Sequence, residues 1–247
     1  MPGLANLRIG CAGRTIPRAV ASQLTGDSTH LRRYARVLTG VELNSSVYGP
    51  HRPGTYARWV AAIPGDVAFA VEVPKAITHE RRLVGADAVI DRFLSEAATL
   101  GERLGPLLVL LPPNLVLDPI VAATFFTTLR RRFAGPVVCE PRHASWFSDR
   151  AELLLRSFRV ARVAADPAPV PAAARPGGWP GLAYYRLHGA PTPDRSAHAA
   201  DRLEALAARL RRHLRDRQVV WCIFDNTAEG AATADALGLL ARLGRVR

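Results

Sequence analysis

The chain has 247 residues, of which 49% are hydrophobic and 22% are charged, and these proportions exclude wholesale disorder. Its formal net charge is +12, from 33 basic and 21 acidic residues, and Lys75 is the single lysine. This excess of arginine raises the expectation of an acidic partner, such as nucleic acid or a phosphorylated metabolite. The alternative is that the arginines cover solvent-exposed helix faces, because no run of five like charges occurs.

Cysteine usage and hydropathy indicate a reduced cytoplasmic protein without a membrane segment. The three cysteines, Cys11, Cys139 and Cys222, lie far apart in apolar runs, and no C-x-x-C pair is present. The first ten residues lack the apolar core of a signal peptide, and no apolar stretch of 18 residues occurs. No linker divides the chain, so we expect one domain over residues 1–247.

Eight apolar runs alternate with amphipathic segments along the chain. Most of the runs are continuously apolar, which is typical of parallel strands that are buried on both faces. The predicted strands cover residues 7–13, 40–45, 68–74, 107–112, 137–142, 160–166, 182–189 and 219–226.

The segments between the predicted strands repeat apolar residues at helical spacing. The predicted helices include residues 31–38, 56–63, 90–97, 121–129, 203–214 and 236–243, and the Asp118-Pro119 pair is expected to start the fourth of them. The connection from Asp166 to Pro180 contains five prolines and is predicted to be a loop with at most a short turn.

This order of elements predicts an α/β fold, a single (β/α)8 TIM-like barrel whose sixth strand-to-helix connection is irregular. A doubly wound open sheet is the alternative. That alternative is disfavoured because no G-x-G-x-x-G motif follows the first predicted strand.

In such a barrel the functional groups come from the carboxyl ends of the strands, and these ends are polar here. Alternate residues of a strand share a face, so Glu42 shares a face with Asn44, and Glu140 shares one with Arg142. Each pair is expected to point into the barrel mouth. The candidate site residues are Glu42, Asn44, Tyr48, Lys75, His79, Glu140, Arg142, His143, Trp146, Arg186, His188, Asp225 and Asn226.

We predict that five of these residues converge in one pocket: Glu42, Glu140, Arg142, Arg186 and His188. Arg186 should form a salt bridge with Glu140 or Glu42, because an unpaired buried charge is strongly destabilising. His188 should stay accessible to solvent while Arg186 is mostly buried. The alternative is that these charges form a closed ion network with a purely structural role.

The chemistry of these side chains favours an enzyme of hydrolase or lyase type that acts on an anionic substrate. Glu42 or Glu140 would act as general base, and His188 or His143 as general acid. Arg142, Arg186 and Lys75 would bind a phosphate or carboxylate group. The remaining candidates, Asn44, Tyr48, His79, Trp146, Asp225 and Asn226, would complete the substrate site. This hypothesis needs neither a metal nor a cofactor.

Five sequence runs resemble the YecE-like family, which is catalogued as domain of unknown function seventy-two. The runs are Glu42-Leu-Asn-Ser-Ser-Val-Tyr48, Pro74-Lys-Ala-Ile-Thr-His79, Glu140-Pro-Arg-His-Ala-Ser-Trp-Phe147, Tyr185-Arg-Leu-His-Gly189 and Phe224-Asp-Asn226. The resemblance covers nearly the whole chain in the same order. It implies a TIM-like barrel and no established reaction.

The chain departs from the family pattern at two places. Arg14 stands where the family has an aromatic residue, in Gly13-Arg-Thr-Ile-Pro17, and residues 190–198 lack the tyrosines of close relatives. If those aromatic residues stack on a ligand, this chain is expected to have altered specificity or weakened activity.

Two other classes of function remain open. The first is a metal-dependent phosphodiesterase-like or isomerase-like enzyme, in which Glu42, Glu140, His188 and Asp225 would supply ligands. The second is a non-catalytic nucleic-acid or nucleotide-binding protein, in which Tyr48, Trp146 and Tyr184 would stack on bases. Backbone binding of nucleic acid weakens steeply with salt, which distinguishes it from a pocket for a small metabolite.

Overall fold

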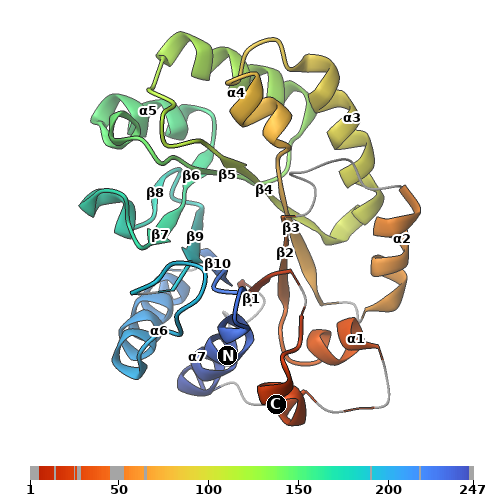
Figure 1. Cartoon of the computed structure of the whole chain (residues 1–247). Helices are drawn as coiled ribbons and strands as arrows, with labels where there is room; N and C mark the ends of the chain where they lie inside the picture. The colour runs from red at the N-terminus through yellow and green to blue at the C-terminus, as the bar shows by residue number, and fades with distance from the viewer. Residues whose placement is uncertain are drawn as a thin grey trace.

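The computed structural model describes residues 6–13, 15–24, 26, 29–44, 53–63, 66–189, 191–216 and 218–244. Their strands form one sheet, arranged around a central axis with the helices outside (Figure 1). The strands are β1 (Leu7–Ala12), β2 (Gly40–Leu43), β3 (Ala68–Glu72), β4 (Leu104–Leu110), β5 (Val137–Glu140), β6 (Val160–Arg162), β7 (Ala164–Asp166), β8 (Gly177–Gly178), β9 (Leu182–Leu187) and β10 (Val219–Phe224).

The helices lie mostly between consecutive strands, as a TIM-like barrel requires. They are α1 (His30–Ala35), α2 (Pro53–Ala62), α3 (Asp87–Ala97), α4 (Pro119–Arg132), α5 (Asp149–Ser157), α6 (Ala200–Arg215) and α7 (Ala231–Arg242). Shorter helical turns are η1 (Arg18–Gln23), η3 (Ala76–Glu80), η4 (Ala98–Arg103), η5 (Ala144–Phe147) and η6 (Pro171–Ala174).

The predicted barrel is confirmed, with one change in how it closes. The strand order is β7-β9-β10-β1-β2-β3-β4-β5-β6-β8, and every pairing except β6 with β8 is parallel. The run predicted as one strand, 160–166, divides at Val163: β6 pairs with β5, whereas β7 pairs with β9. Because β6 and β7 are consecutive in the chain, they join the two ends of the sheet and nearly close the barrel.

Several predicted strands are too long at their carboxyl ends. The ladders of β3 and β5 stop at Glu72 and Glu140, shortly before Pro74 and Pro141. Proline has no backbone N–H to donate, so pairing cannot continue through it. The predicted helices are all present. Asp118 caps α4 as expected, accepting hydrogen bonds from the backbone N–H groups of Ile120 and Val121 at 2.9 and 3.1 Å.

Besides short helical turns, the structure contains one helix and one strand that were not predicted, α5 and β8. The N-terminus of α5 carries a standard signal, because the Ser148 hydroxyl accepts a hydrogen bond from Ala151 N–H and Asp149 and Glu152 occupy the first turn. The two glycines of β8 pair antiparallel with β6 inside the irregular sixth connection. A Cβ at Gly178 would lie 2.4 Å from the Val160 carbonyl oxygen, so this close pairing requires glycine.

The barrel interior is filled below its mouth by a separate apolar cluster. Within it, the rings of Tyr184 and Trp221 stack at 6.1 Å between centroids, together with Leu108, Val138 and Ile223. Side chains two residues apart on a strand share a face, so Val138, Tyr184 and Ile223 point inward like the polar residues Glu140, Arg186 and Asp225 that follow them. The apolar layer therefore forms the base on which the charged residues of the mouth rest.

Candidate functional site

Arg186 lies at the centre of a network of four carboxylates inside the barrel mouth. Its Nε is 2.9 Å from Glu42 Oε1, and its Nη1 is 3.1 Å from Glu140 Oε2. Its Nη2 is 2.8 Å from Asp225 Oδ2 and 3.6 Å from Glu72 Oε2. The four acids come from β2, β5, β3 and the end of β10, and we call them and Arg186 the Arg186 network. The predicted pairing of Arg186 with Glu42 or Glu140 is confirmed for both.

Burial raises the pKa of Glu140 and of Glu72 and Arg186 lowers it, and the balance of the two effects differs between these acids. Burial would raise the pKa of Glu140, but Arg186, a hydrogen bond from His188 and Arg142 hold that pKa well below its usual range. Burial outweighs Arg186 at Glu72 and raises its pKa to about 8. At neutral pH the network therefore contains an ionised Glu140 beside a mostly protonated Glu72.

His188 lies above the network and touches it on both ring nitrogens. Its Nε2 is 3.4 Å from Glu140 Oε1, and its Nδ1 is 3.3 Å from Asp225 Oδ2 and 3.4 Å from Asp194 Oδ1. Burial disfavours the imidazolium, but hydrogen bonds to Asp225 and Glu140 raise the pKa of His188 to about 9. His188 is therefore protonated at neutral pH.

Arg142 completes this arrangement at the rim of the mouth. Its Nη2 is 2.5 Å from Glu140 Oε1 and 3.0 Å from His188 Nε2. A guanidinium group can only donate, so its contact with a protonated imidazole is repulsive by itself. Glu140 Oε1 is within ion-pair distance of both cations, at 2.5 Å from Arg142 and 3.4 Å from His188, and this attraction offsets their repulsion.

A cavity of about 580 Å³ opens above the Arg186 network, and we call it the mouth cavity. Seven predicted site residues line it: Asn44, Lys75, His79, Arg142, Arg186, His188 and Asp225. Its wall also contains Glu72, Leu110, Pro167, Pro193, Asp194 and Thr227. The mouth of the barrel thus combines cations, carboxylates and an imidazole around one space.

Glu42 and Glu140 lie beneath this cavity rather than in its wall. Both are fully buried, and their oxygens bond to Arg186, to Arg142 and to the Tyr184 hydroxyl, which donates to Glu42 Oε2 at 2.7 Å. The prediction that His188 stays accessible to solvent is wrong, because its side chain is buried at 7% exposed, close to the 4% of Arg186, which is buried as predicted. Arg142, at 27%, is the accessible member of the predicted group of five.

Three other predicted site residues have structural contacts outside the mouth cavity. Asn226 is fully buried and donates to Ser196 O at 2.9 Å and to Asp235 Oδ2 at 2.7 Å. His143 caps η5, its Nδ1 accepting from Ser145 N–H at 3.2 Å. Trp146 is in the core and donates to Leu115 O at 2.9 Å. Tyr48, like Arg14, lies outside the described residues.

The nucleic-acid hypothesis named three aromatic residues, and two of them cannot stack on a base in this structure. Tyr184 and Trp146 are buried, at 0% and 1% exposed, the first in the apolar cluster inside the barrel and the second in the main hydrophobic core. Aromatic side chains were assigned from their nearness to basic positions in the sequence, which carries no information about depth.

The structure adds Glu72 and Asp194 to the residues found by sequence reasoning. Glu72 interrupts the apolar run of β3, and a charged residue inside a buried strand is the same signal that identified Glu42 and Glu140. Asp194 carries no such signal. It follows β9 in a loop, with φ of 66°, and its N–H donates to His188 O at 2.5 Å.

A family model described as "Protein of unknown function DUF72" matches residues 8–247. The chain belongs to the DUF72 family. This confirms the predicted resemblance, since the match covers almost the whole sequence.

Two relatives are both named UPF0759 protein YecE. The chain is 30% identical to the protein of Escherichia coli strain K12 over 151 residues, which are 59% of this chain and 55% of the relative. It is 29% identical over 125 residues to that of Escherichia coli O157:H7, covering 50% of this chain and 45% of the relative. The matched region thus spans about half the length of these relatives.

Solved structures of two family members share the fold. The chain superposes on a DUF72 family protein, EF0366, of Enterococcus faecalis V583 with a TM-score of 0.80 and 22% identity, over 98% of this chain and 96% of the other. For TM1631 of Thermotoga maritima MSB8 the TM-score is 0.75 at 20% identity, over 97% and 99%. At these identities the likeness establishes the barrel fold alone.

One group of described side chains could hold a metal ion. A ligand atom from each of His188, Asp194 and Asp225 lies within 4.8 Å of the others, at the wall of the mouth cavity. This set shares His188 and Asp225 with the predicted one, and Asp194 takes the place of Glu42 and Glu140, which lie beneath the cavity. Among the described residues, no helix has the length and hydrophobicity needed to span a membrane.

Proposed function

We propose that this protein is an enzyme that uses metal-independent acid–base chemistry on a small substrate bearing a phosphate or carboxylate group. The observation that carries the proposal is the position of His188. This imidazole lines the mouth cavity and contacts Glu140 on one ring nitrogen and Asp225 on the other. A titratable group with a strongly shifted pKa in a concave site is the kind of group that transfers protons in catalysis.

Arg142 and Lys75 are the residues that we assign to the substrate anion. Both line the mouth cavity, and their side chains are 27% and 46% exposed. Arg186, by contrast, has its guanidinium surrounded by four carboxylates. It is better suited to holding the acids in place than to binding substrate, which revises the role predicted from the sequence. Asn44 and His79 would supply further polar contacts from the same wall.

The acid and base roles go to the groups that reach the mouth cavity. His188 would donate its proton to the leaving oxygen of the substrate, and Asp225 would accept a proton from the attacking water or from a substrate carbon. Removal of a proton from water corresponds to a hydrolase, and removal of a proton from a substrate carbon corresponds to a lyase. Glu42 and Glu140 would be positioning residues, because they are sealed beneath the cavity and act through Arg186 and His188.

Titration with inorganic phosphate tests the anion site. We expect Arg142→Gln to weaken phosphate binding about tenfold, because it removes a charge-assisted hydrogen bond worth about 1.5–3 kcal/mol. Calorimetric titration at low salt measures this. Arg92→Gln is the matched control, since Arg92 is 69% exposed on α3, where it pairs with the partly buried Glu96, and it does not line the mouth cavity. Absence of phosphate binding by the wild-type protein, or equal binding by both variants, would contradict the assignment.

A metal-dependent form of the same enzyme is the second candidate, and the group of His188, Asp194 and Asp225 favours it. Titration with Mn²⁺, followed by electron paramagnetic resonance of the free ion, separates the two candidates. Stoichiometric binding that Asp194→Asn weakens at least tenfold would favour the metal-dependent form. If Mn²⁺ does not bind and the phosphate titration succeeds, the metal-independent form stands.

A further inference from the structure

A second cavity lies on the outer side of the barrel wall, between the strands β7 and β9 and helix α6. It has a volume of about 340 Å³, within the range of small-molecule sites, and we call it the outer pocket. Tyr185 and Leu187 line it, and they alternate along β9 with Arg186, so they point to the opposite face of the strand. The outer pocket is therefore a different site from the mouth cavity.

The irregular sixth connection explains why this space exists. In a regular (β/α)8 barrel, a helix would follow the sixth strand and pack against the outer face of the sheet. Here residues 167–181 contain only η6 and the two-residue β8. The outer face of β7 and β9 is left to α6, and the outer pocket remains beside that helix.

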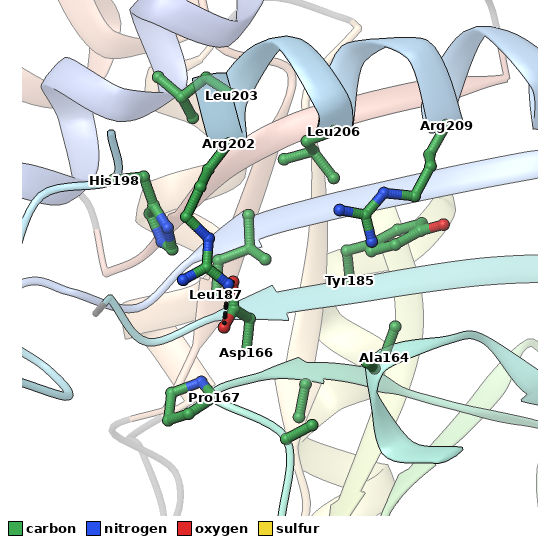
Figure 2. Close-up of a pocket in the computed structure, with 13 residues that line it drawn as sticks. Ala164, Asp166, Pro167, Tyr185, Leu187, His198, Arg202, Leu203, Leu206 and Arg209 are labelled. Carbon is green, nitrogen blue, oxygen red and sulfur yellow. Dashed lines mark hydrogen bonds and ion pairs between the residues drawn. The ribbon is translucent and has the colours of Figure 1, made fainter. Parts of the chain in front are cut away.

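The walls of the outer pocket are mostly apolar. Leu187, Leu203 and Leu206 are buried side chains that contribute to it, together with Ala164 and Ala165. Figure 2 shows Leu206 extending from α6 toward the strands, opposite Leu187. Burial of such a surface against the apolar body of a ligand removes apolar area from water and therefore favours binding.

The positive charge in the outer pocket is unevenly balanced. Arg202 and Arg209 lie two turns apart on α6 and reach toward the strands on either side of Leu206 (Figure 2). Arg202 is neutralised by Asp166, with its Nη2 at 2.8 and 3.0 Å from the two carboxylate oxygens. Among the described residues, Arg209 instead donates a hydrogen bond at 3.4 Å to the Ala205 carbonyl of its own helix, which carries no negative charge. One end of the pocket thus carries a net positive charge.

His198 adds a polar group to the same wall. The residue is 8% exposed, its ring meets that of Phe224 at 5.7 Å, and its Nε2 has no hydrogen-bond partner among the described residues. A buried polar atom without a partner is rare in a folded protein and destabilises it. An apolar pocket with a few convergent polar groups is typical of ligand sites.

We propose that the outer pocket binds a small amphipathic monoanion, whose carboxylate pairs with Arg209 and whose apolar body lies on Leu187, Leu203 and Leu206. A single anionic head matches a pocket in which only one of the two guanidinium groups is already neutralised. A neutral ligand would leave the charge of Arg209 uncompensated, and a cationic one would be repelled by it.

Equilibrium dialysis with labelled octanoate, kept below its micelle concentration, tests the proposal. We expect saturable binding of one octanoate per chain, which Arg209→Gln weakens about tenfold through loss of the charged contact. Octanol, which has the same chain without the charge, should bind at least tenfold more weakly than octanoate. Ala168→Trp, which places a large ring into the pocket from the surface loop, should abolish binding.

Two matched variants locate the site. Arg212→Gln removes the same charge from an exposed position of α6 outside the pocket lining, and Arg142→Gln removes it from the mouth cavity. Both should bind octanoate like the wild-type protein. The proposal is overturned if octanoate does not saturate, if Arg209→Gln binds it normally, or if octanol binds equally well. None of these outcomes affects phosphate binding at the mouth cavity, so the two proposals fail separately.

Discussion

Replacement of Arg186 by methionine is expected to lower the free energy of unfolding by about 3–5 kcal/mol or more. Methionine replaces the aliphatic part of the arginine side chain and removes the charged guanidinium group. Four acids around it, Glu42, Glu72, Glu140 and Asp225, would then lose their shared counter-ion inside the barrel. Removing one partner of a buried ion pair is strongly destabilising because the other charge stays buried without compensation. Urea denaturation at pH 7, followed by circular dichroism, measures the loss.

Two further variants separate this effect from ordinary loss of a surface charge. Arg92→Gln removes the charge of a 69% exposed arginine that pairs with Glu96 one turn along α3, and it should change the free energy of unfolding by less than about 0.5 kcal/mol. Adding Glu42→Gln to Arg186→Met removes one of the uncompensated charges and should recover part of the stability. A loss below about 1 kcal/mol for Arg186→Met, or no recovery in the double variant, would show that the network contributes little to stability.

The stability of the protein is expected to fall as the pH rises from about 6.5 to 9. The folded-state pKa of His188 is raised to about 9, against about 6.5 in an unfolded chain. Its stabilising contribution is therefore complete below pH 6.5 and is lost as the pH passes through 9. A shift of this size corresponds to about 3 kcal/mol.

Glu72 changes stability in the same direction over an overlapping range. Burial raises its folded-state pKa to about 8, so the folded protein retains a proton that the unfolded chain has already released above about pH 4.5. Between those values the unfolded state binds fewer protons than the folded state, and stability declines as the pH rises. Ionised Glu72 is then buried beside the other acids of the Arg186 network.

Urea midpoints measured between pH 6 and 9 test both contributions. His188→Gln should flatten the decline over its upper part, and Glu72→Gln should flatten it up to about pH 8. Glu140 does not interfere, because its pKa lies far below this window. Stability that rises over this range, or a decline that both variants retain in full, would contradict the protonation states described for the mouth.

The barrel and most of the side chains that face its mouth could be predicted from the amino-acid sequence alone. Continuous apolar runs identify strands buried on both faces, and the alternation of side chains places Glu42, Glu140 and Arg186 on the inner face. Their pairing follows from the instability of an unpaired buried charge. The prediction placed both Asp225 and Asn226 in the site and was wrong for Asn226: neighbouring residues of a strand point to opposite faces, and Asn226 donates to Asp235 instead.

Three features depend on the tertiary structure: how deeply each side chain of the mouth is buried, how the barrel closes, and the presence of the outer pocket. Depth depends on what packs above a side chain, so Glu42 is sealed while Asp225, which faces the same axis, borders the mouth cavity. Closure depends on pairing between strands that are distant in sequence, and the division at Val163 lets one short run pair with both β5 and β9. Periodicity describes which way a residue points along its own strand, whereas exposure and pairing are set by elements that the local sequence does not contain.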